Sequence, residues 1–226
     1  MVYLILLGLL FFMQLLTASW YDLVQKTAAD RKKIFKHRML CSGIYIACVL
    51  LCTVIGAGFT DLFALMFTGA FFLLFISDAL ESFEKELIKF ISVFLRFSGY
   101  LVMAIALIIK SKELFEEPFM STRLGLIIAF ACSIICIVLD SIKMHHIPPL
   151  IALLYLLANA ILTGIPLHRS GEPMMQAASC ALIMGAVALA ISNTLSVFDK
   201  NNQKSLLRIN LYYFGLMFIS CSVAVL

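Results

Sequence analysis

The chain has 226 residues and a formal net charge of +4; 63% of its residues are hydrophobic and only 13% are charged. A soluble domain is about 45–50% apolar and about 25% charged, so this composition excludes soluble globular, disordered and coiled-coil proteins. The basic residues lie in short loops between apolar runs, which excludes a nucleic-acid-binding surface. An all-α, polytopic integral membrane protein remains.

Eight apolar runs follow one another along the chain. A bilayer core of roughly 30 Å requires about 20 apolar residues in a helix. In chain order, the predicted spans cover about 2–20, 39–58, 61–80, 87–109, 124–140, 148–166, 173–197 and 206–226. We therefore expect one membrane domain, 1–226, with eight transmembrane helices. The first run lacks a preceding basic segment, so we expect a retained anchor rather than a cleaved signal peptide.

Lysine and arginine are distributed unevenly between the two sides of this predicted bundle. Twelve of these residues lie on one side, in the connection after the first span and in every second connection after that. Four lie in the connections on the opposite side. Cytoplasmic loops carry the excess of Lys and Arg. We therefore expect both termini outside and the basic loop 21–38 in the cytoplasm, in the cell membrane if the organism is a bacterium.

Two segments 115 residues apart share a pattern. Residues 76–85 read ISDALESFEK, and residues 191–200 read ISNTLSVFDK. Both end the third span of a group of four, and both run in the same direction. The pattern predicts a parallel 4+4 repeat, with pseudo-repeats of about 1–110 and 111–226 and a functional site between the halves.

Polar residues within the predicted spans gather toward the cytoplasmic side. A charge in hydrocarbon costs at least ~2.5 kcal/mol on insertion scales, so such residues indicate function. Asp78 lies about one turn inside the third span, and Arg96 lies deeper in the fourth but can extend toward the headgroups. We expect the two to interact. Two interpretations stay open: a structural ion pair, or a polar cavity for an amphiphile's headgroup. Other polar residues at this side are Asp140, Ser192, Asn193 and Asn210.

Seven cysteines all lie inside apolar segments. Cys41, Cys48 and Cys52 fall on one helical face, as do Cys132 and Cys136. No spacing indicates a disulfide framework or a zinc site, so we expect packing residues.

Motifs of soluble enzymes are absent from the sequence: it contains no GxSxG, HExxH or P-loop. His145 and His146 precede Pro148-Pro149 without a carboxylate or cysteine at metal-ligand spacing, so we expect turn residues. We expect no metal and no cofactor.

Three segments carry motifs of a known family. Residues 185–195 (GAVALAISNTL) resemble a GA-x-L-F-x-x-SD-x-x-L segment, residues 211–216 (LYYFGL) resemble a tyrosine-rich last span, and residues 73–80 (LLFISDAL) resemble a segment ending in Gly-Asp-x-x-Leu. In these segments the chain resembles the lysoplasmalogenase-like, YhhN-type family of eight-span membrane proteins. The resemblance implies hydrolysis of the vinyl ether bond of lysoplasmalogen or a related lysolipid, by general acid–base chemistry in an intramembrane cavity.

The resemblance also implies roles for particular residues. Asp78 would act as acid and base, Asn193 and Ser192 would orient water, and Arg96 would hold phosphate. The implied catalytic residues are thus Asp78 and Asn193, and the implied substrate-binding residues are Ser77, Arg96, Ser192, Asn210 and Tyr213. The implied partners are a lysolipid or other amphiphile and the bilayer, with no nucleic acid; a homodimer stays open.

The sequence departs from the family pattern at several polar positions. Asn193 stands where the second aspartate is expected, Ser77 replaces a glycine, and Leu216 replaces a glutamine. The family's histidine in the fourth span has no counterpart. These departures keep a second hypothesis open, a non-enzymatic protein of the same fold that binds or transports lipid. A small-solute transporter is less favoured, because the spans offer few ionisable groups for coupling.

Overall fold

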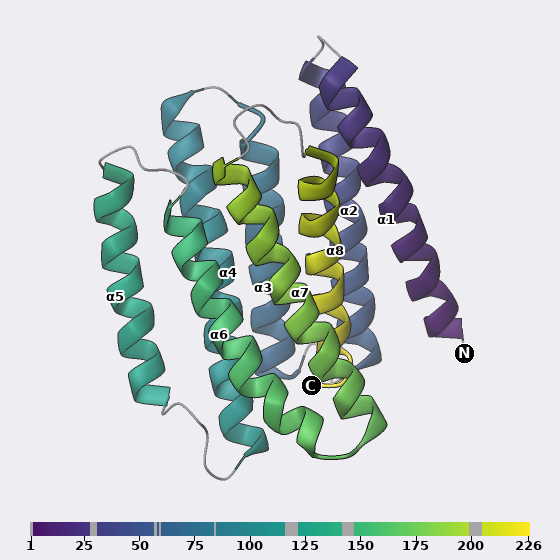
Figure 1. Cartoon of the computed structure of the whole chain (residues 1–226), viewed down its shortest axis with the longest axis vertical. Coiled ribbons are helices and arrows are strands. Elements are labelled where there is room, and N and C mark those ends of the chain that lie inside the picture. The colour runs from purple at the N-terminus through teal and green to yellow at the C-terminus, as the bar shows by residue number, and fades with distance from the viewer. Residues whose placement is uncertain are drawn as a thin grey trace.

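A computed structural model describes residues 2–27, 31–56, 58, 60–83, 85–115, 122–141, 147–198 and 205–226. These described residues form eight helices that run alternately up and down one bundle (Figure 1). The helices are α1 Val2–Thr27, α2 Arg31–Ile55, α3 Leu62–Leu80, α4 Glu86–Leu114, α5 Thr122–Ser141, α6 Ile147–Arg169, α7 Pro173–Phe198 and α8 Ser205–Val223. The expected all-α class is confirmed.

Seven helices of the described chain, all except α5, are long and apolar enough to cross a membrane. Large apolar side chains also point outward, with Phe12 and Trp20 each 58% exposed and Phe130 69% exposed. A soluble monomer rarely presents so much apolar surface, and in lipid a helix satisfies its own backbone polar groups. These features fit a multi-pass membrane protein.

The basic stretch between α1 and α2 differs from its expected form. Residues 21–38 were expected as a loop, but α1 continues to Thr27 and α2 already begins at Arg31. Lysine and arginine are good helix formers, so α2 starts about two turns before its apolar part. Arg38 therefore sits on α2, and the helix determines the direction in which its side chain projects.

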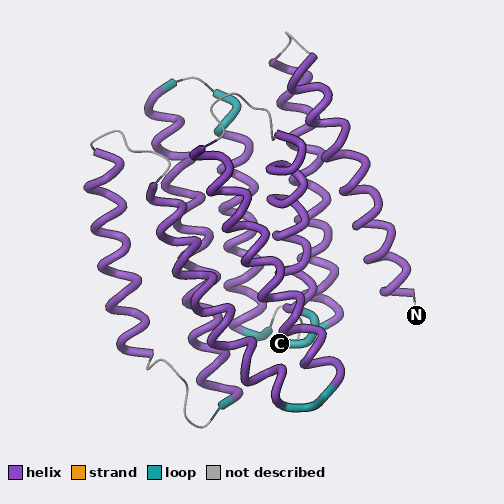
Figure 2. Tube along the Cα trace, viewed as in Figure 1, coloured by secondary structure: helices purple, strands orange, loops and turns teal. Residues whose placement is uncertain are grey.

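Six helices form a closed ring, in the order α2, α3, α4, α6, α7, α8 and back to α2. The other two lie outside it: α1 packs on α2 and α8, and α5 packs on α4 and α6. Figure 2 shows that the two ends of the chain lie at the same end of the bundle. We call the opposite end, where α2, α4, α6 and α8 begin, the basic end.

Local sequence signals set several helix ends. The side chain of Asp61 accepts a hydrogen bond from the Phe63 amide and so caps α3. Pro149 and Pro173 lie in the first turns of α6 and α7, where a helix needs no amide donor. Gly171 has a φ of 79° in the tight connection between those helices, a conformation that glycine adopts without strain.

Candidate functional site

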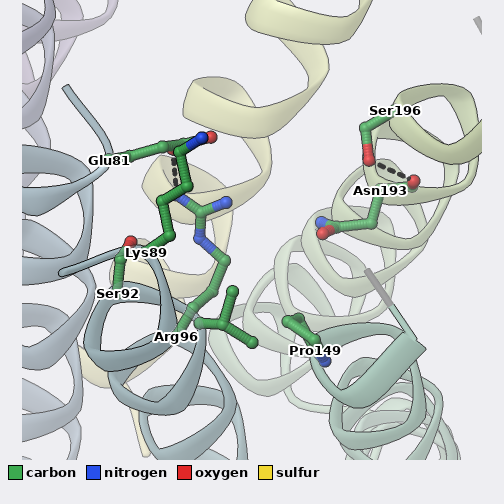
Figure 3. A pocket seen from close by; sticks show the side chains of 8 residues that line it. Glu81, Lys89, Ser92, Arg96, Pro149, Asn193 and Ser196 are labelled. Atoms are coloured by element: carbon green, nitrogen blue, oxygen red, sulfur yellow. Dashed lines mark hydrogen bonds and ion pairs between the residues drawn. The ribbon is translucent and has the colours of Figure 1, made fainter. Parts of the chain in front are cut away.

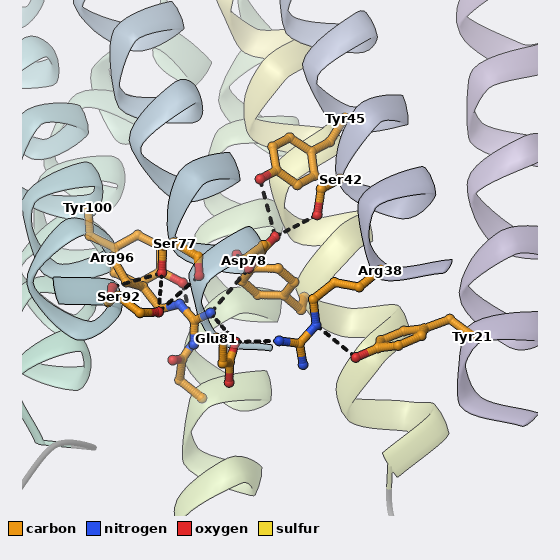
Figure 4. Close-up of polar contacts among 12 residues, drawn as sticks. Tyr21, Arg38, Ser42, Tyr45, Ser77, Asp78, Glu81, Ser92, Arg96 and Tyr100 are labelled. Atoms are coloured by element: carbon orange, nitrogen blue, oxygen red, sulfur yellow. Dashed lines mark hydrogen bonds and ion pairs between the residues drawn. The ribbon is translucent and has the colours of Figure 1, made fainter. Parts of the chain in front are cut away.

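The polar cluster at the basic end centres on the buried carboxyl group of Asp78, near the end of α3 (Figure 4). Ser42 Oγ lies 2.7 Å and the Tyr45 hydroxyl 3.2 Å from its Oδ2. Arg96 Nη2 and the Tyr212 hydroxyl each lie 3.1 Å from its Oδ1. The predicted interaction of Asp78 with Arg96 is confirmed. Each oxygen accepts two hydrogen bonds, which fills the four or so lone-pair sites of a carboxylate.

Glu81 extends this cluster one turn beyond Asp78. Arg96 Nη2 also donates to Glu81, and Arg38 Nη1 lies 3.3 Å from the same carboxyl oxygen. Arg38 Nε donates to the Tyr21 hydroxyl at 2.9 Å. This chain of contacts links α1, α2, α4 and the end of α3 in one network (Figure 4).

Glu81 follows the last residue of α3, outside the membrane-spanning segment, and 44% of its side chain is exposed. Partial burial acts to raise the pKa of its carboxyl group, but attraction to Arg96 and Arg38 outweighs burial. The pKa of Glu81 therefore lies well below its usual range. Glu81 is a permanent anion at neutral pH, and it holds the two guanidinium groups in place.

Two neighbouring cavities adjoin the cluster. Cavity A has a volume of about 400 Å³ and is lined by Glu81, Lys89, Ser92, Val93, Arg96, Pro149, Asn193 and Ser196 (Figure 3). Cavity B has a volume of about 240 Å³ and is lined by Tyr21, Gln25, Arg38, Asp78, Glu81, Arg96, Ser192, Asn193, Ser196, Arg208, Ile209, Tyr212 and Tyr213. In Figure 3, Arg96 and Asn193 project toward the same space from α4 and α7. Both cavities thus bring together the first and second halves of the chain.

Positive charge exceeds negative charge around these cavities. Their lining includes four cationic side chains and two carboxylates, namely Arg38, Lys89, Arg96 and Arg208 against Asp78 and Glu81. Arg96 also keeps a buried Nε that has no hydrogen-bond partner among the described residues. The site therefore favours an anionic group that can accept hydrogen bonds, such as a phosphate.

Three of the predicted site residues lie at cavity B beside Asp78 and Arg96. Asn193 is half-buried, and its Nδ2 lies 3.4 Å from the Tyr100 hydroxyl and 3.1 Å from the Leu189 carbonyl. The Ser192 hydroxyl donates to a backbone carbonyl of α8 at 2.8 Å. Tyr213 is buried and stacks on the ring of Tyr45, with 6.1 Å between centroids. Their predicted functional roles remain predictions.

Two other predicted residues, Ser77 and Asn210, are not among the described residues that line either cavity. The Ser77 hydroxyl donates to the Ser92 carbonyl at 2.8 Å, and the Ser92 hydroxyl donates back to the Ser77 carbonyl at 2.9 Å. This reciprocal pair joins α3 to α4. Asn210 has a buried Oδ1 without a partner among the described residues. The side chain of Asp140, and His145 and His146, lie outside the described residues.

Sequence reasoning missed several members of the site. Glu81 lies three residues after Asp78, so the helical repeat alone could have placed both on one face. Arg38 and Lys89 were counted only as topology signals, because a charge near a span end usually faces water. Tyr212 lies beside the predicted Tyr213, but nothing local shows that it would reach Asp78.

In comparisons with known proteins, no family model, no curated protein and no solved structure matches the chain.

Proposed function

We propose that this protein binds a single-chain phospholipid, such as lysoplasmalogen or another lysolipid, with its phosphate at cavity A. The observation that carries the proposal is the excess of cationic side chains around cavities shared by both halves. Ligand cavities generally measure about 300–1,000 Å³. Cavity A, at about 400 Å³, suits one headgroup and the start of one chain better than a two-chain lipid.

The position of the cavities supports a lipid ligand. They lie at the basic end of a bundle whose outer surface is apolar. A headgroup held there would keep its phosphate near the membrane surface, and its chain could lie along the apolar helices. With the twelve-to-four bias of Lys and Arg, we assign this end to the cytoplasm and both termini to the outside, with α5 as the eighth span.

The 4+4 repeat gains support from similar contacts in the two halves, although the two acceptor carbonyls differ by one residue in register, Ser92 in one half and Arg208 in the other. The Ser77 hydroxyl donates to a carbonyl of α4, and the Ser192 hydroxyl donates to a carbonyl of α8. A shift of 115 residues relates the two serines. The same shift makes α3 correspond to α7 and α4 correspond to α8. The same shift relates Asp78 to Asn193, and both line cavity B. A ligand in this site would therefore contact corresponding positions of both halves.

Hydrolysis of a vinyl ether is a second candidate function. One observation favours it: Asp78 and Asn193 line the same cavity as Arg96. The reaction needs a proton on the alkenyl carbon, followed by water on the oxocarbenium carbon. However, all four acceptor sites of Asp78 are already used, so it would have to release a donor before it could act on a substrate. Binding is therefore the better supported function.

A direct binding experiment tests the proposal. Purified protein in detergent is titrated with lysophosphatidylethanolamine, with lysoplasmalogen of the same headgroup, and with a monoacylglycerol that lacks phosphate. We expect both phospholipids to bind and the monoacylglycerol to bind much more weakly. Equal affinity for all three would contradict recognition of the phosphate. Aldehyde release is assayed separately in the lysoplasmalogen samples.

A matched pair of variants locates the phosphate. Lys89→Gln removes an exposed charge from the lining of cavity A, whereas Lys85→Gln removes one four residues earlier, outside both linings. An exposed charge contributes about 0.2–1 kcal/mol, so Lys89→Gln should weaken phospholipid binding by a factor between about 1.4 and 5, and Lys85→Gln should not. The same effect in both variants would indicate attraction to the basic end as a whole.

A further inference from the structure

Three cysteine sulfurs meet at the end of the bundle opposite cavities A and B. Cys48 and Cys52 lie one turn apart on α2, and Cys221 lies in the last turn of α8. Their Sγ atoms are all within 4.8 Å of one another. Cys48 and Cys52 are completely buried, whereas Cys221 is partly exposed. Neither the lipid site nor its polar network uses these thiols.

The backbone around the thiols brings them together. A Cβ atom on Gly56 would lie 3.0 Å from the Val223 carbonyl oxygen, so the glycine lets the end of α2 approach the end of α8 closely. Beside Cys52, the Thr53 and Thr68 hydroxyls are 3.0 Å apart and join α2 to α3. The cysteines are therefore held by helix packing on two sides, and a bound ion would not have to gather them from a mobile loop.

We propose that Cys48, Cys52 and Cys221 form a binding site for a soft monovalent metal ion, of which Cu(I) is the representative. Thiolate sulfur is the ligand type that selects Cu(I) and zinc. Structural zinc sites almost always have four protein ligands. In the described chain, the group holds three sulfurs and no histidine or carboxylate as a fourth member. Three soft ligands around one small ion match a trigonal site for Cu(I).

Binding proceeds without a change of oxidation state. Cu(I) accepts an electron pair from each coordinating sulfur, and each thiol that binds as a thiolate releases one proton to solvent. No electron is transferred, so no oxidant or reductant is consumed. Cys221, the partly exposed member on the last turn of α8, is the sulfur that an arriving ion meets first.

Competition with a chromophoric chelator tests the site. The full-length protein, reduced and kept without oxygen in detergent, is mixed with the Cu(I)–bicinchoninate complex, and transfer of the ion is followed by loss of the complex's colour. We expect one Cu(I) per chain. Cys221→Ser and Cys52→Ser should each weaken retention by more than about tenfold, because each removes one of three ligands. X-ray absorption of the loaded protein should show only sulfur neighbours.

The remaining cysteines provide the control. A variant that replaces Cys41, Cys132, Cys136 and Cys180 by serine keeps the three clustered thiols and should bind Cu(I) like the unaltered protein. Because it leaves the cluster intact, it remains informative if a single Cys→Ser variant fails to fold. Loss of binding in this variant would overturn the assignment, and so would Cu(I) retention that survives Cys221→Ser. Tighter retention of Zn(II) in a parallel chelator assay would overturn the choice of a monovalent ion.

Discussion

Asp78 receives hydrogen bonds from three other helices. Ser42 and Tyr45 reach it from α2, Arg96 from α4 and Tyr212 from α8. A carboxylate taken out of water needs such partners, because burial of an uncompensated charge is costly. Through these contacts Asp78, which was predicted to be catalytic, also joins α3 to three other helices.

Two substitutions, Asn193→Asp and Asp78→Asn, test the catalytic hypothesis. We expect weak or absent aldehyde release from lysoplasmalogen in the natural protein and a measurable gain in Asn193→Asp, since one acid–base group contributes about 10²–10⁴-fold. Asp78→Asn should abolish any release. It should still fold, because Glu81 continues to pair with Arg96 and the surrounding hydroxyls can accept from the new amide.

Two results would decide against this chemistry. Robust cleavage that survives Asp78→Asn would place the catalytic group elsewhere. A protein that binds the lipid but gains nothing from Asn193→Asp would favour the non-enzymatic function. Size-exclusion chromatography of each variant checks that it is folded.

Glu81 gives the protein a predicted acid sensitivity. Its folded-state pKa is lowered, mainly by Arg96 and Arg38 acting against burial, so its stabilising contribution is complete above the unfolded pKa of about 4.3. That contribution is lost as the pH falls through this value toward the lower folded pKa. We expect the melting temperature to fall between about pH 5 and pH 3, and to fall less in Glu81→Gln.

The control for Glu81→Gln is Glu172→Gln, which removes an exposed carboxylate from the connection between α6 and α7. This variant should follow the pH dependence of the unaltered protein. Parallel curves for the Glu81→Gln variant and the unaltered protein would show that the ion pairs at Glu81 add no acid-dependent stability.

At the level of helices, α3 packs on α4 and α7 packs on α8 through close contacts at small residues. A Cβ atom on Gly99 of α4 would lie 3.1 Å from the Ala70 carbonyl oxygen of α3. One on Gly215 of α8 would lie 2.9 Å from the Gly185 carbonyl oxygen of α7. A shift of 115 residues relates Ala70 to Gly185. Small residues thus let each helix pair approach closely, as is common between membrane helices.

Substitution of a contact glycine should destabilise the α7–α8 pair. A Cβ atom on Gly185 would lie 2.7 Å from the Gly215 carbonyl oxygen and 2.9 Å from the Ile219 amide nitrogen, both backbone atoms that cannot rotate away. Overpacking of this kind typically costs about 1–3 kcal/mol, so Gly185→Ala should lower the melting temperature in detergent.

The matched control is Gly69→Ala on α3, where nothing lies within 4 Å of the new Cβ atom. Alanine is the better helix former by about 0.8–1.0 kcal/mol, so this variant should be neutral or slightly more stable. A Gly185→Ala protein as stable as the Gly69→Ala protein would contradict the close α7–α8 contact.

In the whole molecule, the two proposed binding sites occupy opposite ends of the bundle. The arginine-rich cavities lie at the basic end, and the three clustered thiols lie at the end that carries both termini. The bias of Lys and Arg predicts that the basic end faces the cytoplasm. A lipid headgroup and a metal ion would then reach the protein from different sides of the membrane.

Cysteine labelling in intact cells tests this orientation. In a cysteine-free background, a cysteine placed at Lys32, near the start of α2, should react with an impermeant reagent only after the cells are permeabilised. A cysteine placed at Ser170, exposed between α6 and α7, should react in intact cells. Labelling of the Lys32→Cys protein in intact cells would reverse the predicted topology.

The sequence was sufficient to predict the helical class, the order of the helices and the pairing of Asp78 with Arg96. In lipid, long apolar runs form helices because a helix satisfies its own backbone polar groups, and two opposite charges buried in consecutive spans stabilise each other. The ends of the helices were harder to predict. Arg31 to Arg38 is helical because a helix can continue past its apolar part, which hydrophobicity alone does not reveal.

Only the tertiary structure decided which distant residues meet. Tyr212 reaches Asp78 from 134 residues away, and Cys221 joins Cys48 and Cys52 because α8 closes the ring against α2. The pattern of one helix shows which of its residues share a face, but not which helix will cover that face. Contacts between the first and last helices of a ring depend on how the whole chain packs, so they arise only when the bundle closes.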